Sequence, residues 1–509
     1  TFRSPESYVL PLRELIQEGG LSMETIDNRV RDILRVKFLT GLFDTPYQTD
    51  LALADKEVNS EAHQQVALQA SREGLVLLKN ANNLLPLDKS QIKRIAVCGP
   101  NADEASFALT HYGPVAVEVT TVLEGIRQQV KEGTKVTYTK GCDLVDANWP
   151  ESEIISYPLT AEEKTEIQKA VDNVKESDVA VVVLGGGIRT CGENKSRTSL
   201  DLPGHQQQLL EAIAATGKPV VLVLINGRPL SINWADKFVP AILEAWYPGS
   251  QGGTAIAEAL FGDYNPGGKL TVTFPKTVGQ IPFNFPAKPA SQVDGGQTPG
   301  MKGNQSRING PLYPFGYGLS YTTFEYSNLQ LSSPVITDKE PVTVTCKIKN
   351  TGTRSGDEVV QLYTRDVVSS VTTYEKNLRG FERVHLEPGE TKEVSFQLLP
   401  RDFQLLNKDN HWVVEPGMFQ IMIGASSEDI RLKKGLEIRA YGQASTNEII
   451  ESDPRDFISA SKNKSHILHV VDGDYSTTWK GEKGEYISFE LAENAKVDRI
   501  NVAWKNAEA

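Results

Sequence analysis

The sequence predicts a multidomain protein in which an α/β domain is followed by all-β modules, and three observations support this. The chain has 509 residues, several times the roughly 150 residues of an average domain. Between about residues 60 and 290, continuous apolar strands alternate with amphipathic helices, as in a sheet covered on both faces. Beyond about residue 320, short alternating strands recur between turns, as in a β-sandwich.

The first fifty residues predict the end of a domain rather than a whole one. Ser22 is placed as the N-cap of a helix that Gly41 ends, and apolar residues recur between them at helical spacing. One helix with a short preamble cannot bury its own apolar face. The segment is therefore expected to pack against partners that lie outside it.

The α/β domain follows in clear order. A short strand ends in a Gly-Pro turn, and Thr160 with Glu163 forms a capping box that opens a helix. Further apolar strands alternate with another helix, which predicts a parallel or mixed sheet. The expected segments, in order, are a strand at 93–102, a helix from 160, a strand at 179–184, a helix at 206–215 and a strand at 220–225.

The all-β part begins after a stretch rich in Gly, Pro, Ser, Gln and Asn at residues 287–320. Four expected strands alternate polar and apolar residues, at 341–350, 358–367, 392–399 and 418–426. After about residue 445 the pattern changes again, to a β-module that is short for a complete sandwich.

The composition excludes several classes of function. Lys and Arg number 53 against 65 Asp and Glu, so the net charge is −12, which argues against a nucleic-acid partner and favours neutral ligands. No apolar run reaches the length of a membrane span, and the N-terminus lacks a signal-peptide pattern. The four cysteines never form a CxxC pair, so we expect mostly reduced, buried thiols, with a disulfide left open.

The loop after the strand at 179–184 carries the most informative chemistry. Gly185, Gly186 and Gly187 allow a sharp turn, and Glu193 then follows among the cations Arg189, Lys195 and Arg197. The residues alone leave three interpretations open. The first is a dinucleotide site, for which the usual GxGxxG motif is absent. The second is a solvated turn whose charged side chains pair with one another. The third is a general acid in a loop at the edge of an α/β sheet.

Four long segments resemble the C-terminal half of glycoside hydrolase family 3, the β-glucosidase and β-xylosidase family, and they occur in that family's order at 71–87, 192–206, 245–275 and 313–326. The resemblance covers about residues 1–440. It implies that Glu193, four residues before Arg197 and ahead of a Leu-Asp-Leu-Pro-Gly segment, is the general acid/base. Arg197 and Arg189 would bind substrate or support the loop. Where many relatives have Gly-Tyr-Asp, this chain has Asn-Lys-Ser at 194–196, which puts local contacts in doubt.

The resemblance also exposes an absence. Relatives carry an Asp nucleophile in a Ser-Asp-Trp motif of a (β/α)₈ barrel, and neither that motif nor the sugar-gripping Lys-His pair occurs here. Residues 1–50 are similar to the C-terminal end of such a barrel, whose full length is about 250 residues. We therefore expect the nucleophile outside this chain, the missing N-terminal barrel segment as its partner, and no activity from the chain alone.

The same resemblance divides the chain up to residue 443 into an α/β sandwich domain at 51–310 and a fibronectin type III-like domain with its linker at 311–443. Separately, residues 444–509, which contain the segment VVDGDYSTTW at 470–479, resemble a partial discoidin-like (F5/8 type) module. Asp472 and Asp474 fall near the calcium loop of such modules. A structural calcium ion is therefore an open possibility, and no organic cofactor is expected.

The implied function is that of an exo-acting, retaining β-glycosidase that releases glucose or xylose from the non-reducing ends of oligosaccharides. A bacterial periplasmic or secreted location is expected. The alternative is a non-catalytic carbohydrate-binding or scaffold protein, favoured by the absent nucleophile and the two C-terminal β-modules.

Overall fold

The computed structural model describes residues 4, 6–45, 50–109, 112–113, 117–281, 283–288, 310–442, 458–460 and 487–489. The chain divides into two units, residues 1–64 and residues 65–509. Among the described residues, no helix combines the length and the hydrophobicity that crossing a membrane requires.

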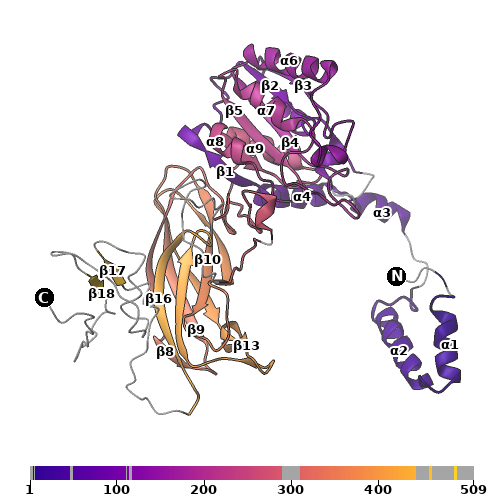
Figure 1. Cartoon of the computed structure of the whole chain (residues 1–509), viewed down its shortest axis with the longest axis vertical. Helices are drawn as coiled ribbons and strands as arrows, with labels where there is room; N and C mark the ends of the chain where they lie inside the picture. Colours follow the sequence, from indigo (N-terminus) through magenta and orange to yellow (C-terminus); the bar gives the residue numbers. More distant parts are fainter. Residues whose placement is uncertain are drawn as a thin grey trace. The chain divides into compact units, whose positions relative to one another are not determined.

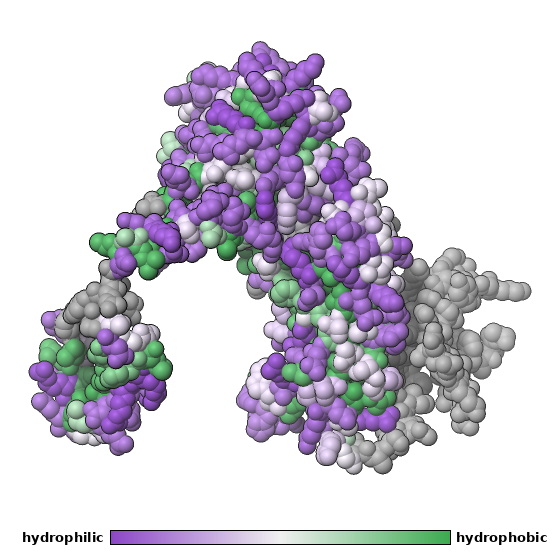
Figure 2. Space-filling view, turned by 180° about the vertical axis from the view of Figure 1, so that it is seen from behind, coloured by the Kyte–Doolittle hydropathy of each residue, from purple (hydrophilic) through white to green (hydrophobic). Residues whose placement is uncertain are grey.

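The first unit is helical, with α1 (Val9–Gln17), α2 (Met23–Leu39) and α3 (Leu51–Glu57). The predicted start of α2 is confirmed, because the Ser22 side chain accepts a hydrogen bond from Thr25 N. Gly41 has a φ of +69° just beyond the helix, which an L side chain rarely adopts. No residue of α1 or α2 is buried, and apolar patches are visible on this helical pair (Figure 2).

The second unit begins within α4 (Glu61–Gly74), which crosses the division. Its main feature is a six-stranded sheet in the order β1-β6-β5-β4-β2-β3 (Figure 1). All neighbours are parallel except β1, which pairs antiparallel with β6, so the predicted mixed sheet is confirmed. The strands are β1 (Val76–Asn80), β2 (Arg94–Cys98), β3 (Lys135–Thr139), β4 (Val179–Gly185), β5 (Val220–Ile225) and β6 (Ala241–Glu244).

Helices cover both faces of this sheet. Apolar residues of α5 (Val122–Gln129) and α9 (Gly252–Phe261) join one core cluster. Those of α6 (Ala161–Lys175), α7 (Gln206–Ala214) and α8 (Asn233–Phe238) join the cluster on the other face. The capping box predicted at Thr160 and Glu163 is present at the start of α6. Every residue of β4 and β5 is buried, as their unbroken apolar runs require.

A β-sandwich follows, made of a five-stranded sheet in the order β11-β10-β15-β16-β8 and a three-stranded sheet in the order β12-β9-β7. Alternate residues of these strands fill one apolar core. The small β13-β14 pair lies outside these two sheets. The strands are β7 (Phe324–Leu331), β8 (Val335–Thr337), β9 (Val342–Asn350), β10 (Gly356–Asp366), β11 (Asn377–Leu386), β12 (Thr391–Leu398), β13 (Leu405–Leu406), β14 (Trp412–Val413), β15 (Gly417–Gly424) and β16 (Ile430–Arg439).

Direct polar contacts join the α/β part to the sandwich. Lys269 Nζ lies 3.0 Å from Glu358 Oε1, and both side chains are almost fully buried. Asn265 Nδ2 donates a hydrogen bond to Ser355 O at 2.9 Å. The sandwich is therefore attached to the α/β domain by buried contacts as well as by the linker.

Only two short strands are described after residue 442, namely β17 (Ile458–Ala460) and β18 (Ile487–Phe489), which pair antiparallel. Asp472 and Asp474, proposed as calcium ligands, lie outside the described residues. The discoidin-like module and the domain limits at 50, 310 and 443 stay predictions.

Candidate active site

The order of the strands decides where a ligand site can lie. The chain runs from β2 to β3 on one side of β2, and then to β4 on its other side. In open α/β sheets, ligands bind beyond the carboxyl ends of strands where the winding reverses in this way. The loops after β2 and β4 meet here, since Asn101 Nδ2 donates to Gly186 O at 2.8 Å. The loop that carries Glu193 therefore starts at the switch point of the sheet.

Backbone conformation and hydrogen bonds hold the first residue of this loop, Gly185, in place. Gly185, at the end of β4, has a φ of +138°, and a side chain there would collide with Ile225 O. Gln206, the first residue of α7, encloses the glycine with its buried amide. Its Oε1 accepts from Gly185 N at 2.8 Å, and its Nε2 donates to Gly185 O at 2.9 Å and to Leu144 O at 2.8 Å. The next helix begins only here, so the glycines do not lead into the helix N-terminus that a dinucleotide site uses.

Glu193 lies at the corner of a tight turn. Lys195 N donates to Gly192 O at 3.1 Å, and Asn194 between them has a φ of +62°. A turn with positive φ at its third residue favours Gly or Asn, which explains the Asn in this chain. The Glu193 carboxylate is exposed, and its Oε2 accepts a hydrogen bond of 3.0 Å from Tyr112 Oη in the loop after β2.

The cations of the loop separate into two kinds. The Arg197 side chain is only 4% exposed and forms an ion pair with Glu153, whose side chain is 6% exposed. Arg197 Nη2 also donates to Asp201 O at 2.9 Å, and its guanidinium lies 5.1 Å from the centre of the Trp149 ring. Burial lowers the pKa of Arg197, and Glu153 opposes that effect. Arg197 therefore supports the loop through Glu153 and Asp201 O.

Arg189 and Lys195 differ from Arg197, because both are exposed. In the part of the chain that the structure describes, neither side chain forms an ion pair or a hydrogen bond. The role predicted for Arg189, in substrate binding or loop support, stays a prediction.

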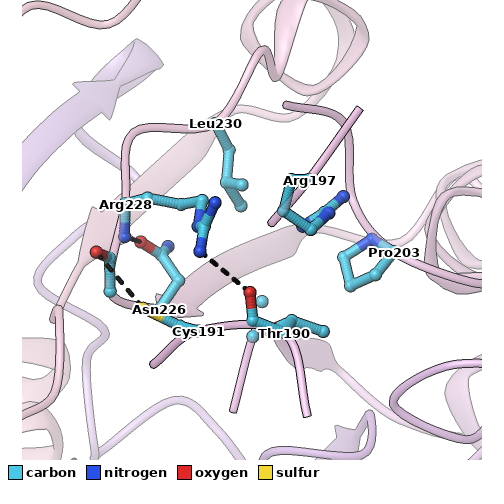
Figure 3. Close-up of a pocket in the computed structure, with 10 residues that line it drawn as sticks. Thr190, Cys191, Arg197, Pro203, Asn226, Arg228 and Leu230 are labelled. Carbon is cyan, nitrogen blue, oxygen red and sulfur yellow. Dashed lines mark hydrogen bonds between the residues drawn. The ribbon is translucent and has the colours of Figure 1, made fainter. Parts of the chain in front are cut away.

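The sequence did not reveal a second brace, Arg228, which follows β5. Its Nη2 donates to Thr190 O at 2.9 Å (Figure 3) and to Lys195 O at 3.2 Å, and these two residues lie on either side of Glu193 in the sequence. The position of Arg228 just beyond a strand, at the same sheet edge, is a signal that could have identified it. Glu153 offered none, because it is 44 residues away from Arg197 in the sequence.

A small pocket lies among these supporting residues, and it leaves no room for the centre of a water molecule. It is the packed base of the loop and cannot hold a sugar. Its lining residues are Gly185, Gly186, Thr190, Cys191, Arg197, Pro203, Asn226, Gly227, Arg228 and Leu230. Among the described residues, no group of three or more His, Cys, Asp or Glu side chains is arranged to hold a metal ion. All four cysteines are free, and Cys191 is the half-buried one.

Comparison with known families agrees with this architecture. Residues 75–321 match the glycosyl hydrolase family 3 C-terminal domain, and residues 358–427 match the fibronectin type III-like domain. The chain belongs to glycoside hydrolase family 3. The α/β domain and the first β-sandwich are thus the predicted ones, and the loop that carries Glu193 lies within the matched family 3 domain.

Relatives of this chain carry the names of β-glycosidases. A β-xylosidase of Formosa agariphila is 43% identical over 431 residues, an alignment that covers 83% of this chain and 56% of that protein. A periplasmic β-glucosidase of Salmonella typhimurium is 39% identical over 447 residues, which are 84% of this chain and 57% of that protein. The chain therefore spans a little over half the length of these family 3 relatives.

Solved structures agree with the sequence matches. A β-glucosidase of Erythrobacter marinus superposes with a TM-score of 0.75 at 37% identity, over 84% of this chain and 57% of that one. A β-glucosidase of Listeria innocua in complex with isofagomine has a TM-score of 0.74 at 33% identity, over 84% of this chain and 58% of that one.

Proposed function

We propose that the intact protein is a retaining, exo-acting β-glycosidase in which Glu193 is the general acid/base. The observation that carries this proposal is the placement of Glu193. It is an exposed carboxylate at the corner of a turn, beyond the switch point of the sheet, in a loop that Arg197 and Arg228 brace. A solvated turn would not require contacts from two arginines to hold its backbone in place, so this arrangement favours the acid/base interpretation.

The proposed reaction needs two carboxyl groups about 5 to 5.5 Å apart. As a nucleophile attacks the anomeric carbon, the protonated Glu193 gives its proton to the departing glycosidic oxygen. The resulting carboxylate then takes a proton from a water molecule, which releases the sugar from the covalent intermediate. Glu193 presents its carboxyl outward, where a sugar held by another part of the protein could reach it.

We place the nucleophile outside these 509 residues, on an Asp of the N-terminal barrel, because the sequence contains no Ser-Asp-Trp motif. The chain alone is then expected to be inactive towards aryl β-glycosides. The relatives named β-xylosidase and β-glucosidase support glucose or xylose as the released sugar, and the acidic chain is compatible with a neutral oligosaccharide. The relative named periplasmic supports a periplasmic or secreted location in a bacterium.

The test is Glu193→Gln in the intact enzyme, measured as kcat/KM on a disaccharide and on a dinitrophenyl glycoside. Loss of proton delivery should lower kcat/KM for the disaccharide by about 10²- to 10⁴-fold. The dinitrophenyl glycoside should lose far less, since its leaving group departs without a proton. Azide should then restore turnover by replacing the activated water and forming a glycosyl azide. Glu162→Gln, on the exposed face of α6, is the matched control and should behave as wild type.

Equal losses on both substrates, with no glycosyl azide, would remove the acid/base role from Glu193. An intact protein that binds oligosaccharides but never cleaves an activated glycoside would instead be a carbohydrate-binding protein. The two outcomes separate an error about the residue from an error about the activity.

A further inference from the structure

A second carboxyl group lies at the same sheet edge, and the proposed reaction does not use it. Glu244 is the last residue of β6 and is completely buried. Its Oε1 accepts a hydrogen bond from Trp246 N at 2.9 Å, and its Oε2 accepts one from Asn226 Nδ2 at 3.1 Å. No ion pair compensates the burial of this group in the described part of the chain. A buried carboxyl without a cation is costly, so its retention at this place needs a reason.

The contacts of Glu244 lead directly to the loop that carries Glu193. Asn226 turns its Nδ2 to Glu244 and its Oδ1 to Arg228 N, at 3.3 Å. The Arg228 side chain then holds Thr190 O and Lys195 O. Glu244, Asn226 and Arg228 therefore form a continuous chain of hydrogen bonds that ends on both sides of Glu193 (Figure 3 shows its part from Asn226 to Thr190).

The backbone around Glu244 is itself held in an uncommon conformation. Trp246 has a φ of +57°, which is rare for a bulky residue and persists only where the surroundings impose it. Here Glu244 binds Trp246 N, and Asn226 N donates to Trp246 O at 3.1 Å. The Glu244 side chain and the Asn226 backbone thus hold the turn after β6, and the Asn226 side chain holds the turn after β5.

We propose that Glu244 is a positioning residue for the acid/base step, which sets the location of Glu193 through Asn226 and Arg228. This inference rests on the proposed function. The mechanism is the orientation of the Asn226 amide. An acceptor at Oε2 of Glu244 draws the NH₂ group of Asn226 towards itself and leaves the amide oxygen for Arg228 N. If a donor replaced Glu244 Oε2, the Asn226 amide would turn over to offer its oxygen to that donor. Its NH₂ group would then face the Arg228 N–H, and two donors would repel each other.

Glu244→Gln tests this, because both Glu244 oxygens accept a hydrogen bond, from Trp246 N and from Asn226 Nδ2, whereas the isosteric amide has only one acceptor oxygen. In the intact enzyme, kcat/KM for the disaccharide should fall by roughly 10- to 100-fold, the size of effect that a displaced reacting group produces. The dinitrophenyl glycoside should lose much less. Glu258→Gln is the matched control. Glu258 is also buried, but it accepts both of its hydrogen bonds from Arg72, and any loss should be equal on the two substrates.

Arg228→Met provides a second variant. It should show the same dependence on the leaving group as Glu244→Gln. If Glu244 acts through Arg228, the double variant should be no worse on the disaccharide than Arg228→Met alone. Losses that multiply would show that Glu244 acts by another route and would overturn the proposal.

Hydrogen exchange of the 509-residue chain adds a readout that does not depend on activity. Glu244→Gln should speed exchange in peptides that cover residues 187–200, whereas Glu258→Gln should not. Unchanged exchange, or equal losses on both substrates, would refute the positioning role. Glu193→Gln, assayed alongside, separates the two proposals. If it shows no dependence on the leaving group, the proposed function fails, and the exchange data still decide whether Glu244 controls the loop.

Discussion

Breaking the buried ion pair between Arg197 and Glu153 should destabilise the protein far more than breaking an exposed one. The two side chains are 4% and 6% exposed. Arg197→Met leaves the Glu153 carboxylate buried without its cation. Within the described residues, the carboxylate then keeps Thr198 N, at 2.9 Å, and Thr198 Oγ1, at 3.2 Å, as donors. The variant also loses the bond from Arg197 to Asp201 O.

The expected loss in the free energy of unfolding is about 3 to 5 kcal/mol, because removing one partner of a buried pair leaves an uncompensated charge. The value should lie near the lower end, since the loop is exposed on its outer side and can open to admit water. Asp143→Asn is the control. Asp143 pairs with Lys140, but the two side chains are 75% and 53% exposed, so the loss should stay below about 1 kcal/mol.

The assay is urea unfolding followed by tryptophan fluorescence, for which Trp149 is a local reporter because its ring lies beside Arg197. The double variant Arg197→Met/Glu153→Leu should recover much of the loss, since it removes both charges together. A coupling energy of about 2 kcal/mol or more is expected from the cycle. Losses that simply add, or an Arg197→Met variant no less stable than Asp143→Asn, would refute this account of the loop.

Three further predictions concern the backbone, the pH dependence and the C-terminus. Gly185→Ala should unfold at a markedly lower temperature than Gly217→Ala, because both positions have positive φ but only the first also collides with backbone. Burial raises the pKa of Glu244 from 4.5 to about 8. Between these values the folded chain holds a proton that the unfolded chain has lost, so its free energy of unfolding should fall by up to about 1.4 kcal/mol per pH unit. Glu244→Gln should flatten this slope in urea titrations. In the intact enzyme, deleting residues 446–509 should leave kcat/KM on small soluble substrates nearly unchanged, whereas a large loss would contradict an accessory role.

Local sequence signals predicted much of the fold. The strands β4 and β5 follow from unbroken apolar runs, and the start of α6 follows from its capping box. These features depend on neighbouring residues, so a single chain segment contains the information. The strand expected at 93–102 was too long, because β2 ends at Cys98, where the chain leaves the sheet for the switch-point loop.

The sequence pattern did not predict several strands of the sandwich, and β11 (Asn377–Leu386) is the clearest case. Its residues are half-buried or exposed apart from Leu386, so its sequence lacks the alternation that marks β9. It pairs with β10 along nine residue positions. Pairing with β10 makes this segment a strand, and its own residues carry no pattern that predicts one.

The sequence by itself determined the family, the order of the domains and the candidate acid/base Glu193, because long motifs and periodic apolar patterns are local properties. Only the tertiary structure decided how Glu193 is held. Arg228 and Glu244 lie at the ends of β5 and β6, which meet at one edge of the sheet because parallel strands end there together. Glu153 reaches Arg197 from the separate segment between β3 and α6. Burial then gives their hydrogen bonds and charges the strength to fix the loop, and burial is a property of the folded chain as a whole.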